Sequence, residues 1–230
     1  MSSVIEIRNL SKSYGRMVVF KDLSFSLPQG RVIGLLGENG IGKTTLLRLI
    51  ARFMMPDSGE ILIDGQKVSR QTKTKVSFLL EPPSFYSFMC VKDAVQYYKD
   101  FFHDFNYEKA IGLCKEYKLG LNRRIKYLSK GNKERLCLLL CLSRDVSVYL
   151  LDEPIAGFDP KFKRDFIKTF ISNVNENATT VICSHLLRDL QTVFDDVVIL
   201  KRNKVEMASA DDIRAQGKSI EDYYMEAVER

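Results

Sequence analysis

The sequence predicts an α/β fold in which a mainly parallel sheet is flanked by helices. In the last third of the chain, apolar runs alternate with helical patterns, as is typical of a parallel sheet covered on both faces. The elements expected there are Val148–Leu151, Lys161–Val174, Thr180–Cys183, Leu187–Phe194 and Val197–Leu200. Nearer the N-terminus, the buried apolar run Val32–Leu36 is followed by a glycine-rich loop and a helical pattern over Lys43–Arg52. A third observation is the different pattern of residues 84–144, which lie between these two parts.

The start of the chain predicts a smaller β subdomain. Short β-rich runs alternate with turns such as Asp64-Gly65. The expected strands are Val4–Ile7, Leu23–Leu27 and Glu60–Ile63. We expect them to form an N-terminal antiparallel sheet. A further strand is expected over Val76–Leu80, ending at Glu81-Pro82-Pro83.

Residues 84–144 predict an inserted α-helical subdomain. Amphipathic patterns at helical spacing cover Val91–Phe102 and Tyr107–Tyr117, and a more apolar helix is expected over Asn132–Ser143. No internal repeat or linker interrupts the sequence. We therefore expect a single domain over residues 1–230, with only the helix Ile220–Val228 beyond the core.

The composition is that of an ordinary globular protein. Of the 230 residues, 45% are hydrophobic and 28% are charged, which excludes disordered, collagen-like and low-complexity proteins. We interpret the net charge of +6 as a surface charge that keeps the protein soluble. The alternative interpretation is contact with an anionic surface such as a membrane leaflet or nucleic acid. A nucleic-acid partner is not expected.

The sequence predicts neither a membrane span nor a signal peptide. The longest apolar run, Leu136–Leu142, is far shorter than the roughly 18–20 residues that cross a bilayer, and the N-terminus lacks a basic region followed by an apolar one. Five cysteines without a CxxC pair suit reduced thiols packed in a core rather than disulfides or a zinc site. We expect a cytoplasmic protein with no direct membrane insertion.

The most specific motif is a phosphate-binding loop. It matches GxxxxGK[ST] between a strand and a helix, and its residues are Gly37, Glu38, Asn39, Gly40, Ile41, Gly42, Lys43 and Thr44, followed by Thr45. Glycines let backbone N–H groups approach a phosphate, and the helix N-terminus adds partial positive charge. Lys43 is expected to reach the β- and γ-phosphates, and the Thr44 hydroxyl is expected to bind Mg²⁺. The motif predicts a nucleoside triphosphate site on a P-loop NTPase core.

Two acidic residues complete this predicted site. Asp152 and Glu153 follow the apolar run Val148–Leu151, so they lie at the carboxyl end of a strand, where α/β sheets present ligand-binding groups. We expect Asp152 to hold Mg²⁺ through water. Glu153 is expected to orient and deprotonate the attacking water.

Further motifs indicate which class of P-loop protein this is. Residues 127–135 read Tyr-Leu-Ser-Lys-Gly-Asn-Lys-Glu-Arg, open a helix and resemble the LSGGQ-like signature motif of ABC ATPases. The run from Asp152 to Asp159 resembles the extended Walker B motif and D-loop of that family, and Ser184-His185 resembles its switch histidine. Tyr14 resembles the aromatic residue that stacks on adenine. The motifs occur in the expected order over nearly the whole chain, which is therefore identified as a member of the ABC ATPases.

The resemblance implies that ATP lies between two subunits. In a head-to-tail dimer, each ATP would be enclosed by the P-loop of one subunit and the signature helix of the other. Ser129 and the Gly131 N–H would face the γ-phosphate in trans, and His185 would contact it in cis. Asp159 would help to couple the two sites. ATP and Mg²⁺ are the implied cofactors.

The sequence departs from the family pattern at several positions. Glu81 stands where the Q-loop glutamine is usual, and a carboxylate is a better ligand for Mg²⁺ but adds negative charge near the triphosphate. We expect Glu81 to alter Mg²⁺ binding or coupling; the alternative is that Gln71 has the Q-loop role. Lys130 replaces a signature glycine, and it either adds positive charge over the ATP of the partner or is simply solvated. Phe158 replaces a smaller aliphatic residue of the D-loop.

These departures resemble those of small export-type ABC ATPases of the bacitracin and lantibiotic self-protection kind. The resemblance implies a motor subunit that drives separate membrane-spanning permease subunits, as a homodimer or paired with a related ATPase, at the inner face of the cell membrane. The Q-loop region and residues 84–144 would form the docking surface. The alternatives are a soluble ABC ATPase of assembly or mechanical signalling and a cassette that only binds ATP.

Overall fold

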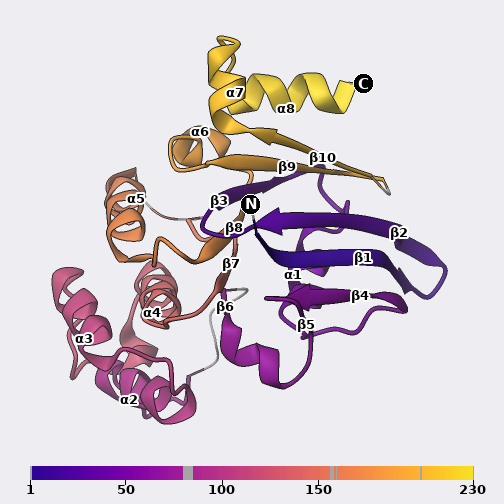
Figure 1. Cartoon of the computed structure of the whole chain (residues 1–230). Coiled ribbons are helices and arrows are strands. Elements are labelled where there is room, and N and C mark those ends of the chain that lie inside the picture. Colours follow the sequence, from indigo (N-terminus) through magenta and orange to yellow (C-terminus); the bar gives the residue numbers. More distant parts are fainter. Residues whose placement is uncertain (1, 80–84, 156–157, 159, 203, 230) are drawn as a thin grey trace.

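The computed structural model describes residues 2–79, 85–155, 158, 160–202 and 204–229 (Figure 1). Its larger sheet has the strand order β10-β9-β3-β8-β7-β6. The strands are β3 (Val32–Leu36), β6 (Val76–Leu79), β7 (Val148–Asp152), β8 (Thr179–Cys183), β9 (Asp196–Lys201) and β10 (Lys204–Ser209). Neighbouring strands are parallel except for the edge strand β10, which is antiparallel to β9. The mainly parallel sheet is confirmed.

The N-terminal strands form a second, antiparallel sheet in the order β2-β1-β4-β5. Its strands are β1 (Ser3–Tyr14), β2 (Met17–Pro28), β4 (Ser58–Ile63) and β5 (Gln66–Lys67). The expected antiparallel subdomain is confirmed, although β1 and β2 are much longer than predicted. Irregular register carries this hairpin through the polar residues after Leu10, where no apolar alternation indicates a strand.

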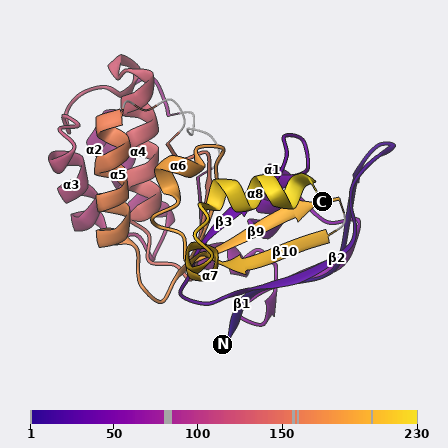
Figure 2. The same ribbon diagram turned by 90° about the horizontal axis from the view of Figure 1, so that it is seen from above.

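Three helices, α2 (Val91–Phe101), α3 (Tyr107–Glu116) and α4 (Lys130–Leu142), form the inserted subdomain with a hydrophobic core of their own. Figure 2 shows them gathered beside the strands. The Asn106 side chain accepts a hydrogen bond from the Lys109 N–H and so caps α3. Ser129 does the same for α4, which begins two residues earlier than its apolar pattern predicts because the cap lies in a polar segment.

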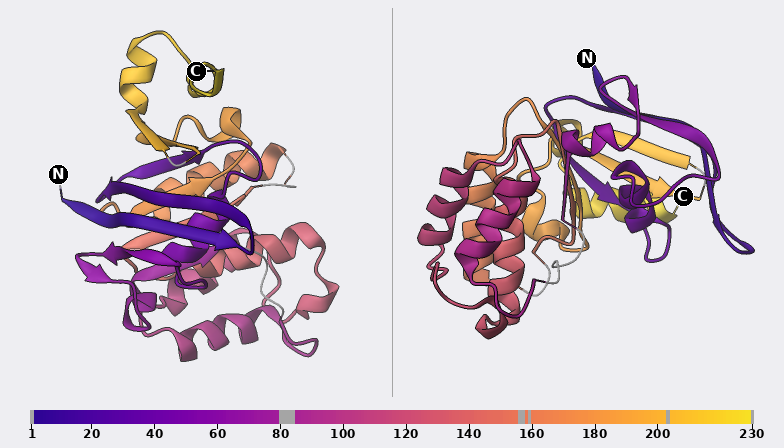
Figure 3. Two further views of the ribbon diagram at one scale, coloured as in Figure 1. Left: turned by 90° about the vertical axis from the view of Figure 1, so that its right-hand side faces the viewer. Right: turned by 90° about the horizontal axis from the view of Figure 1, so that it is seen from below.

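The parallel sheet is buried on both faces. Successive strand residues point to opposite faces, so Leu150 packs with the antiparallel sheet and α1 (Lys43–Ile50), whereas Leu151 packs with α5 (Pro160–Asn173) and α6 (Leu187–Leu190). Two further views show this layered arrangement (Figure 3). The sheet thereby fixes the position of every residue at the carboxyl ends of its strands.

The C-terminal part differs from the prediction. The helix α6 ends at Leu190 rather than Phe194, and β10 and α7 (Ala210–Ala215) precede the expected α8 (Ile220–Glu229). Both additions are short, and β10 is an edge strand with no fully buried residue, so its hydrophobic pattern is weak. The expectation of a single helix beyond the core was wrong.

All five cysteines are buried and carry free thiols, in agreement with a core role. Among the described residues, no helix combines the length and the apolar character that crossing a membrane requires.

Candidate nucleotide-binding and catalytic site

The loop between β3 and α1 has a shape that only glycine permits at two positions. Gly37 has φ +151° and Gly42 has φ +111°. A Cβ atom at Gly42 would lie 2.6 Å from Val19 Cγ1, and one at Gly37 would lie 2.8 Å from the Leu200 carbonyl oxygen. The long strand β2 therefore packs directly against the loop, and the loop backbone carries no side chains at these two glycines.

The Lys43 side chain folds back over this loop. Its ammonium group donates hydrogen bonds to the carbonyl oxygens of Gly37 (2.6 Å) and Glu38 (3.0 Å). Lys43 is also the first residue of α1, so its charge adds to the partial positive charge of the helix N-terminus. The loop combines a cation with backbone N–H groups at the start of a helix, the combination that binds a phosphate.

Thr44 and Asp152 bring two oxygen ligands together across 108 positions of sequence. The Thr44 hydroxyl donates to Asp152 Oδ2 at 2.7 Å. Asp152 ends β7 and is paired with Cys183 of β8, where burial raises the pKa of the thiol, so that the thiol stays neutral beside the carboxylate. A hydroxyl and a carboxylate oxygen are suitable ligands for Mg²⁺.

Glu153 follows Asp152 directly, and its backbone adopts the left-handed conformation, with φ +49°. Its N–H donates to the Cys183 carbonyl oxygen at 2.8 Å, which anchors it to β8. Its carboxylate accepts hydrogen bonds from the Ser184 hydroxyl and the His185 N–H, both at 3.1 Å, and Oε1 lies 2.9 Å from His185 Nδ1. The bound Nδ1 leaves Nε2 of a largely exposed ring available for a ligand.

Tyr14 lies at the end of β1 beside α1. Its hydroxyl is 3.5 Å from Thr45 Oγ1 and donates to the Met54 sulfur at 3.1 Å. The residue remains 42% exposed, so part of the ring is free for contact. The structure thus brings Tyr14 and Thr45 to the same side of the molecule as the loop.

The signature residues lie apart from this cluster, in the inserted subdomain (Figures 1 and 2). Ser129 caps α4 by accepting from the Asn132 N–H at 3.3 Å. The Lys130 side chain is 91% exposed and lies 3.9 Å from Glu134, and a Cβ at Gly131 would meet nothing within 4 Å. No hydrogen bond joins them to the loop within the described part of the chain.

The comparison with protein-family models decides which of the P-loop proteins this is. The model described as "ABC transporter" matches residues 20–156, more than half of the chain. The chain belongs to the ABC transporter family. It is an ATP-binding subunit of this family, whose ATP-binding proteins are ATPases coupled to transport.

Several relatives of this ABC protein are bacterial. The chain is 33% identical to the ABC transporter ATP-binding protein YtrB of Bacillus subtilis over 205 residues, covering 88% of this chain and 70% of YtrB. It is 32% identical to the bacitracin transport ATP-binding protein BcrA of Enterococcus faecalis (87% and 67%) and 28% identical to the lantibiotic transport ATP-binding protein SrtF of Streptococcus pyogenes (88% and 89%). The resemblance to bacitracin and lantibiotic ATPases is confirmed. ATP-binding proteins of importers are also similar, at 28–31% identity.

The fold is that of a solved ABC protein. The structure described as "Structure of ATP binding subunit of ABC transporter" has a TM-score of 0.86 and 24% identity, covering 97% of this chain and 99% of that one. The α/β fold expected from the sequence is therefore confirmed.

Two of the predicted site residues, Glu81 and Asp159, lie outside the described residues. The alternative residue for the Q-loop role, Gln71, opens a short 3₁₀ helix before β6. It is therefore at the amino end of that strand, whereas Asp152 is at the carboxyl end of the parallel neighbour β7. This position speaks against Gln71 as a ligand of the site.

One contact of the site was not predicted. The bond from Ser184 to Glu153 joins residues 31 positions apart, and only the pairing of β7 with β8 brings them together. No motif indicates this contact.

Proposed function

We propose that the chain binds MgATP with the residues at the carboxyl ends of β3, β7 and β8. The observation that carries this proposal is the convergence of Thr44, Asp152 and Glu153 on one edge of the sheet. The loop amides and Lys43 would hold the phosphates, and Thr44 and Asp152 would hold Mg²⁺. The metal ion supplies positive charge that neutralises the phosphate oxygens.

Glu153 is the proposed general base. Its carboxylate would orient the attacking water and take its proton, while His185, bound through Nδ1, would present Nε2 to the γ-phosphate. Tyr14 would stack on the adenine. Glu81 is proposed as a further Mg²⁺ or coupling residue on the strength of its place in the motif order alone.

The signature residues would complete the site of a second subunit, either another copy of this chain or a related ATPase. The support is the open N-terminus of α4, where Ser129 and Lys130 are exposed and a Cβ at Gly131 would meet nothing within 4 Å. The backbone N–H groups of the first turn of a helix have no helical partners. Asp159 is proposed to couple the two sites. We further propose that residues 1–230 act as one nucleotide-binding domain.

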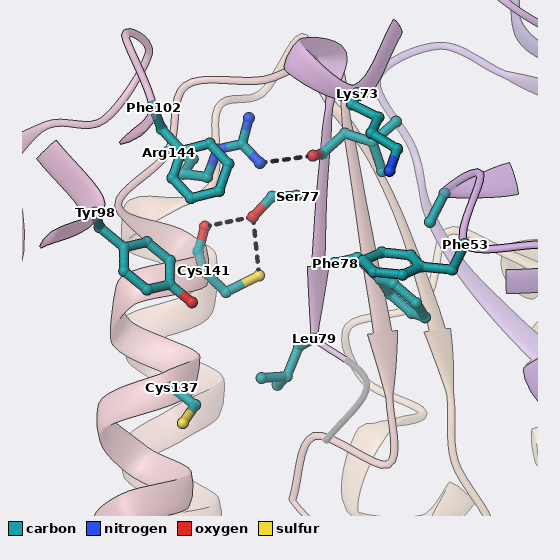
Figure 4. Close-up of a pocket in the computed structure, with 12 residues that line it drawn as sticks. Phe53, Lys73, Ser77, Phe78, Leu79, Tyr98, Phe102, Cys137, Cys141 and Arg144 are labelled. Atoms are coloured by element: carbon teal, nitrogen blue, oxygen red, sulfur yellow. Dashed lines mark hydrogen bonds between the residues drawn. The ribbon is translucent and has the colours of Figure 1, made fainter. Parts of the chain in front are cut away.

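A groove between the core and the inserted subdomain is the proposed docking site for a helix of a separate membrane-spanning permease. The cavity has a volume of about 480 Å³. Figure 4 shows Phe53 and Phe78 on one side of it and Tyr98 and Phe102 on the other. Burial raises the pKa of the Cys137 thiol at its wall to about 12, so this side chain is neutral. The wall is mostly apolar, although Lys73, Ser77 and Arg144 also line it.

Arg144 makes contacts with both sides of the groove. Its guanidinium donates to the Val76 carbonyl oxygen at 2.7 Å and pairs with Asp104, and it stacks on Phe102 with 4.0 Å to the ring centroid. The residue is 5% exposed. The paired guanidinium of Arg144 connects the segment after α2 to β6. An occupant of the groove would therefore contact the core and the inserted subdomain at the same time.

Phe53 is the feature of the groove that most favours a protein occupant. It is 67% exposed, and the Lys73 ammonium lies 5.2 Å from its ring centroid. An exposed aromatic residue beside an apolar cavity is typical of an interface anchor. The chain would thus act at the inner face of the cell membrane through its permease and without inserting.

Export is the proposed direction, because the departures from the family motifs resemble those of export-type ABC ATPases. The similarity to bacitracin and lantibiotic transport proteins agrees with that resemblance. The alternative is a soluble ABC ATPase that acts in assembly or mechanical signalling. The groove favours the transporter, since it offers a docking surface that reaches both parts of the ATPase.

The test is an affinity capture of the tagged chain from detergent-solubilised membranes of its native host. Wild type and the control Ile171→Glu, which changes an exposed apolar residue on α5, are expected to retain a polytopic membrane protein. Phe53→Glu is expected to lose it. Recovery of soluble partners alone, or equal capture by Phe53→Glu, would contradict the proposed docking.

A further inference from the structure

Two hydrogen-bond donors and a ring nitrogen, all from two adjacent residues, surround the carboxylate of Glu153. Oε1 takes the His185 N–H and lies 2.9 Å from His185 Nδ1, and Oε2 takes the Ser184 hydroxyl. A carboxylate offers about four lone-pair sites on its two oxygens. Among the described residues, these three groups leave one acceptor site, on Oε2, the oxygen that Ser184 holds.

The direction of the Ser184 bond follows from its other partner. The Leu186 N–H donates to Ser184 Oγ at 3.1 Å, and a backbone N–H is only a donor. The hydroxyl proton is therefore free to point at Glu153. Ser184 is 4% exposed, so water has little access to replace this donor.

The backbone fixes both ends of this contact. Cys183, the residue before Ser184, pairs with Asp152 in the sheet, and its carbonyl oxygen accepts the Glu153 N–H at 2.8 Å. The serine and the glutamate are thus the next residues outward on two adjacent parallel strands. Between them, the hydroxyl is the one contact to Oε2 that the structure shows.

We propose that Ser184 is a positioning residue for ATP hydrolysis, because its hydroxyl aims Oε2 of Glu153 at the attacking water. The inference rests on the proposed role of Glu153 as general base. Misalignment of a base slows proton transfer without changing how tightly the substrate is held. Ser184 acts through Glu153 and does not itself touch ATP.

The experiment is steady-state ATP hydrolysis by the purified full chain with substitutions at position 184. Ser184→Ala is expected to lower kcat about tenfold, the loss expected for one hydrogen bond to a charged group, with KM for ATP little changed. Ser184→Thr keeps the hydroxyl and is expected to restore kcat. Ser184→Cys, a weak donor that keeps the side chain volume, is expected to fall between the two, which keeps the test valid if the alanine variant folds poorly.

Thr180→Val is the matched control. It removes another buried hydroxyl, that of a residue in β8, the strand that Ser184 directly follows. This hydroxyl has no hydrogen-bond partner in the described structure. Its kcat is expected to equal that of wild type. A drop equal to that of Ser184→Ala would show that any loss of a hydroxyl from this strand slows the enzyme, and would overturn the inference.

A Glu153→Gln background separates this inference from the proposed function. If Ser184 acts through Glu153, then Ser184→Ala leaves the residual turnover of Glu153→Gln unchanged. An equal fold-loss in both backgrounds would overturn the positioning role. Full activity of Glu153→Gln itself would instead contradict Glu153 as the base, whereas full activity of Ser184→Ala with an impaired Glu153→Gln would overturn only the present inference.

Discussion

Two helix N-termini of this chain carry candidate phosphate ligands, and they differ in what surrounds them. At α1, Lys43 is bound to carbonyl oxygens of the loop that follows β3, and Thr44 is bound to Asp152 of β7. At α4, the side chain of Lys130 is almost fully exposed and Gly131 borders open space. The first is preorganised within one subunit, and the second has its donors in place but faces solvent. This difference favours a nucleotide that one subunit binds and a second subunit encloses.

The largest effect is expected at the site around the N-terminus of α1, from the loss of the proposed base Glu153. Glu153→Gln should lower the rate of ATP hydrolysis about 10²–10⁴-fold, because the amide cannot accept the proton of the attacking water. ATP binding should persist, since the loop and Lys43 are unchanged. Hydrolysis by the purified chain and an equilibrium ATP titration measure the two quantities. Turnover at the wild-type rate would remove Glu153 from the mechanism.

Lys43→Ala is expected to weaken ATP binding itself, about 10–100-fold in Kd, because a charge-assisted contact to the phosphates is lost. Titration with ATP by calorimetry measures this directly. Tyr14→Ala, on the adenine side of the same subunit, is expected to weaken binding less. An unchanged affinity of the Lys43 variant would mean that the loop does not hold the phosphates.

Glu81→Gln is expected to change the coupling between subunits and permease more than it changes ATP affinity. The substitution would remove one negative charge from the proposed Mg²⁺ or coupling residue but keep an oxygen ligand. The permease-stimulated rate should therefore shift while the Kd for ATP stays within about twofold. Equal losses in both quantities would contradict a coupling role for Glu81.

The smallest effect is expected at the solvent-facing N-terminus of α4, from Lys130→Ala. Its ion pair with Glu134 is long and exposed, and such pairs contribute little to stability, so the melting temperature should not change. If Lys130 faces the ATP of a partner subunit, the substitution should raise KM in the dimer and leave ATP binding by the monomer unaffected. A lower melting temperature would show that Lys130 has a structural role instead.

The site around the N-terminus of α1 was largely predictable from the sequence, because each of its motifs lies within one short segment. The loop needs glycines at fixed spacing between one strand and one helix, and Gly42 has no room for a Cβ beside Val19. Asp152 was predictable because strand ends of a parallel sheet share one edge. The motifs could therefore be read from single segments.

The remaining features depend on contacts between distant segments. The groove joins Phe53, Lys73, Tyr98 and Cys141, which come from four separate segments of the chain, so no local pattern predicts it. The Ser184 contact depends on how β7 and β8 pair. The short elements β10 and α7 have weak patterns and are held in place by their packing against β9.

The most direct test of the account compares the two helix N-termini in one experiment. In the Glu153→Gln background, ATP should bind the monomer and then drive dimer formation, both measurable by titration and by sedimentation. We predict that Lys43→Ala weakens both, whereas Ser129→Arg at the signature helix abolishes dimer formation and leaves ATP binding by the monomer intact. Loss of ATP binding by the Ser129→Arg monomer, or ATP-driven dimers formed by that variant, would contradict a site shared between subunits.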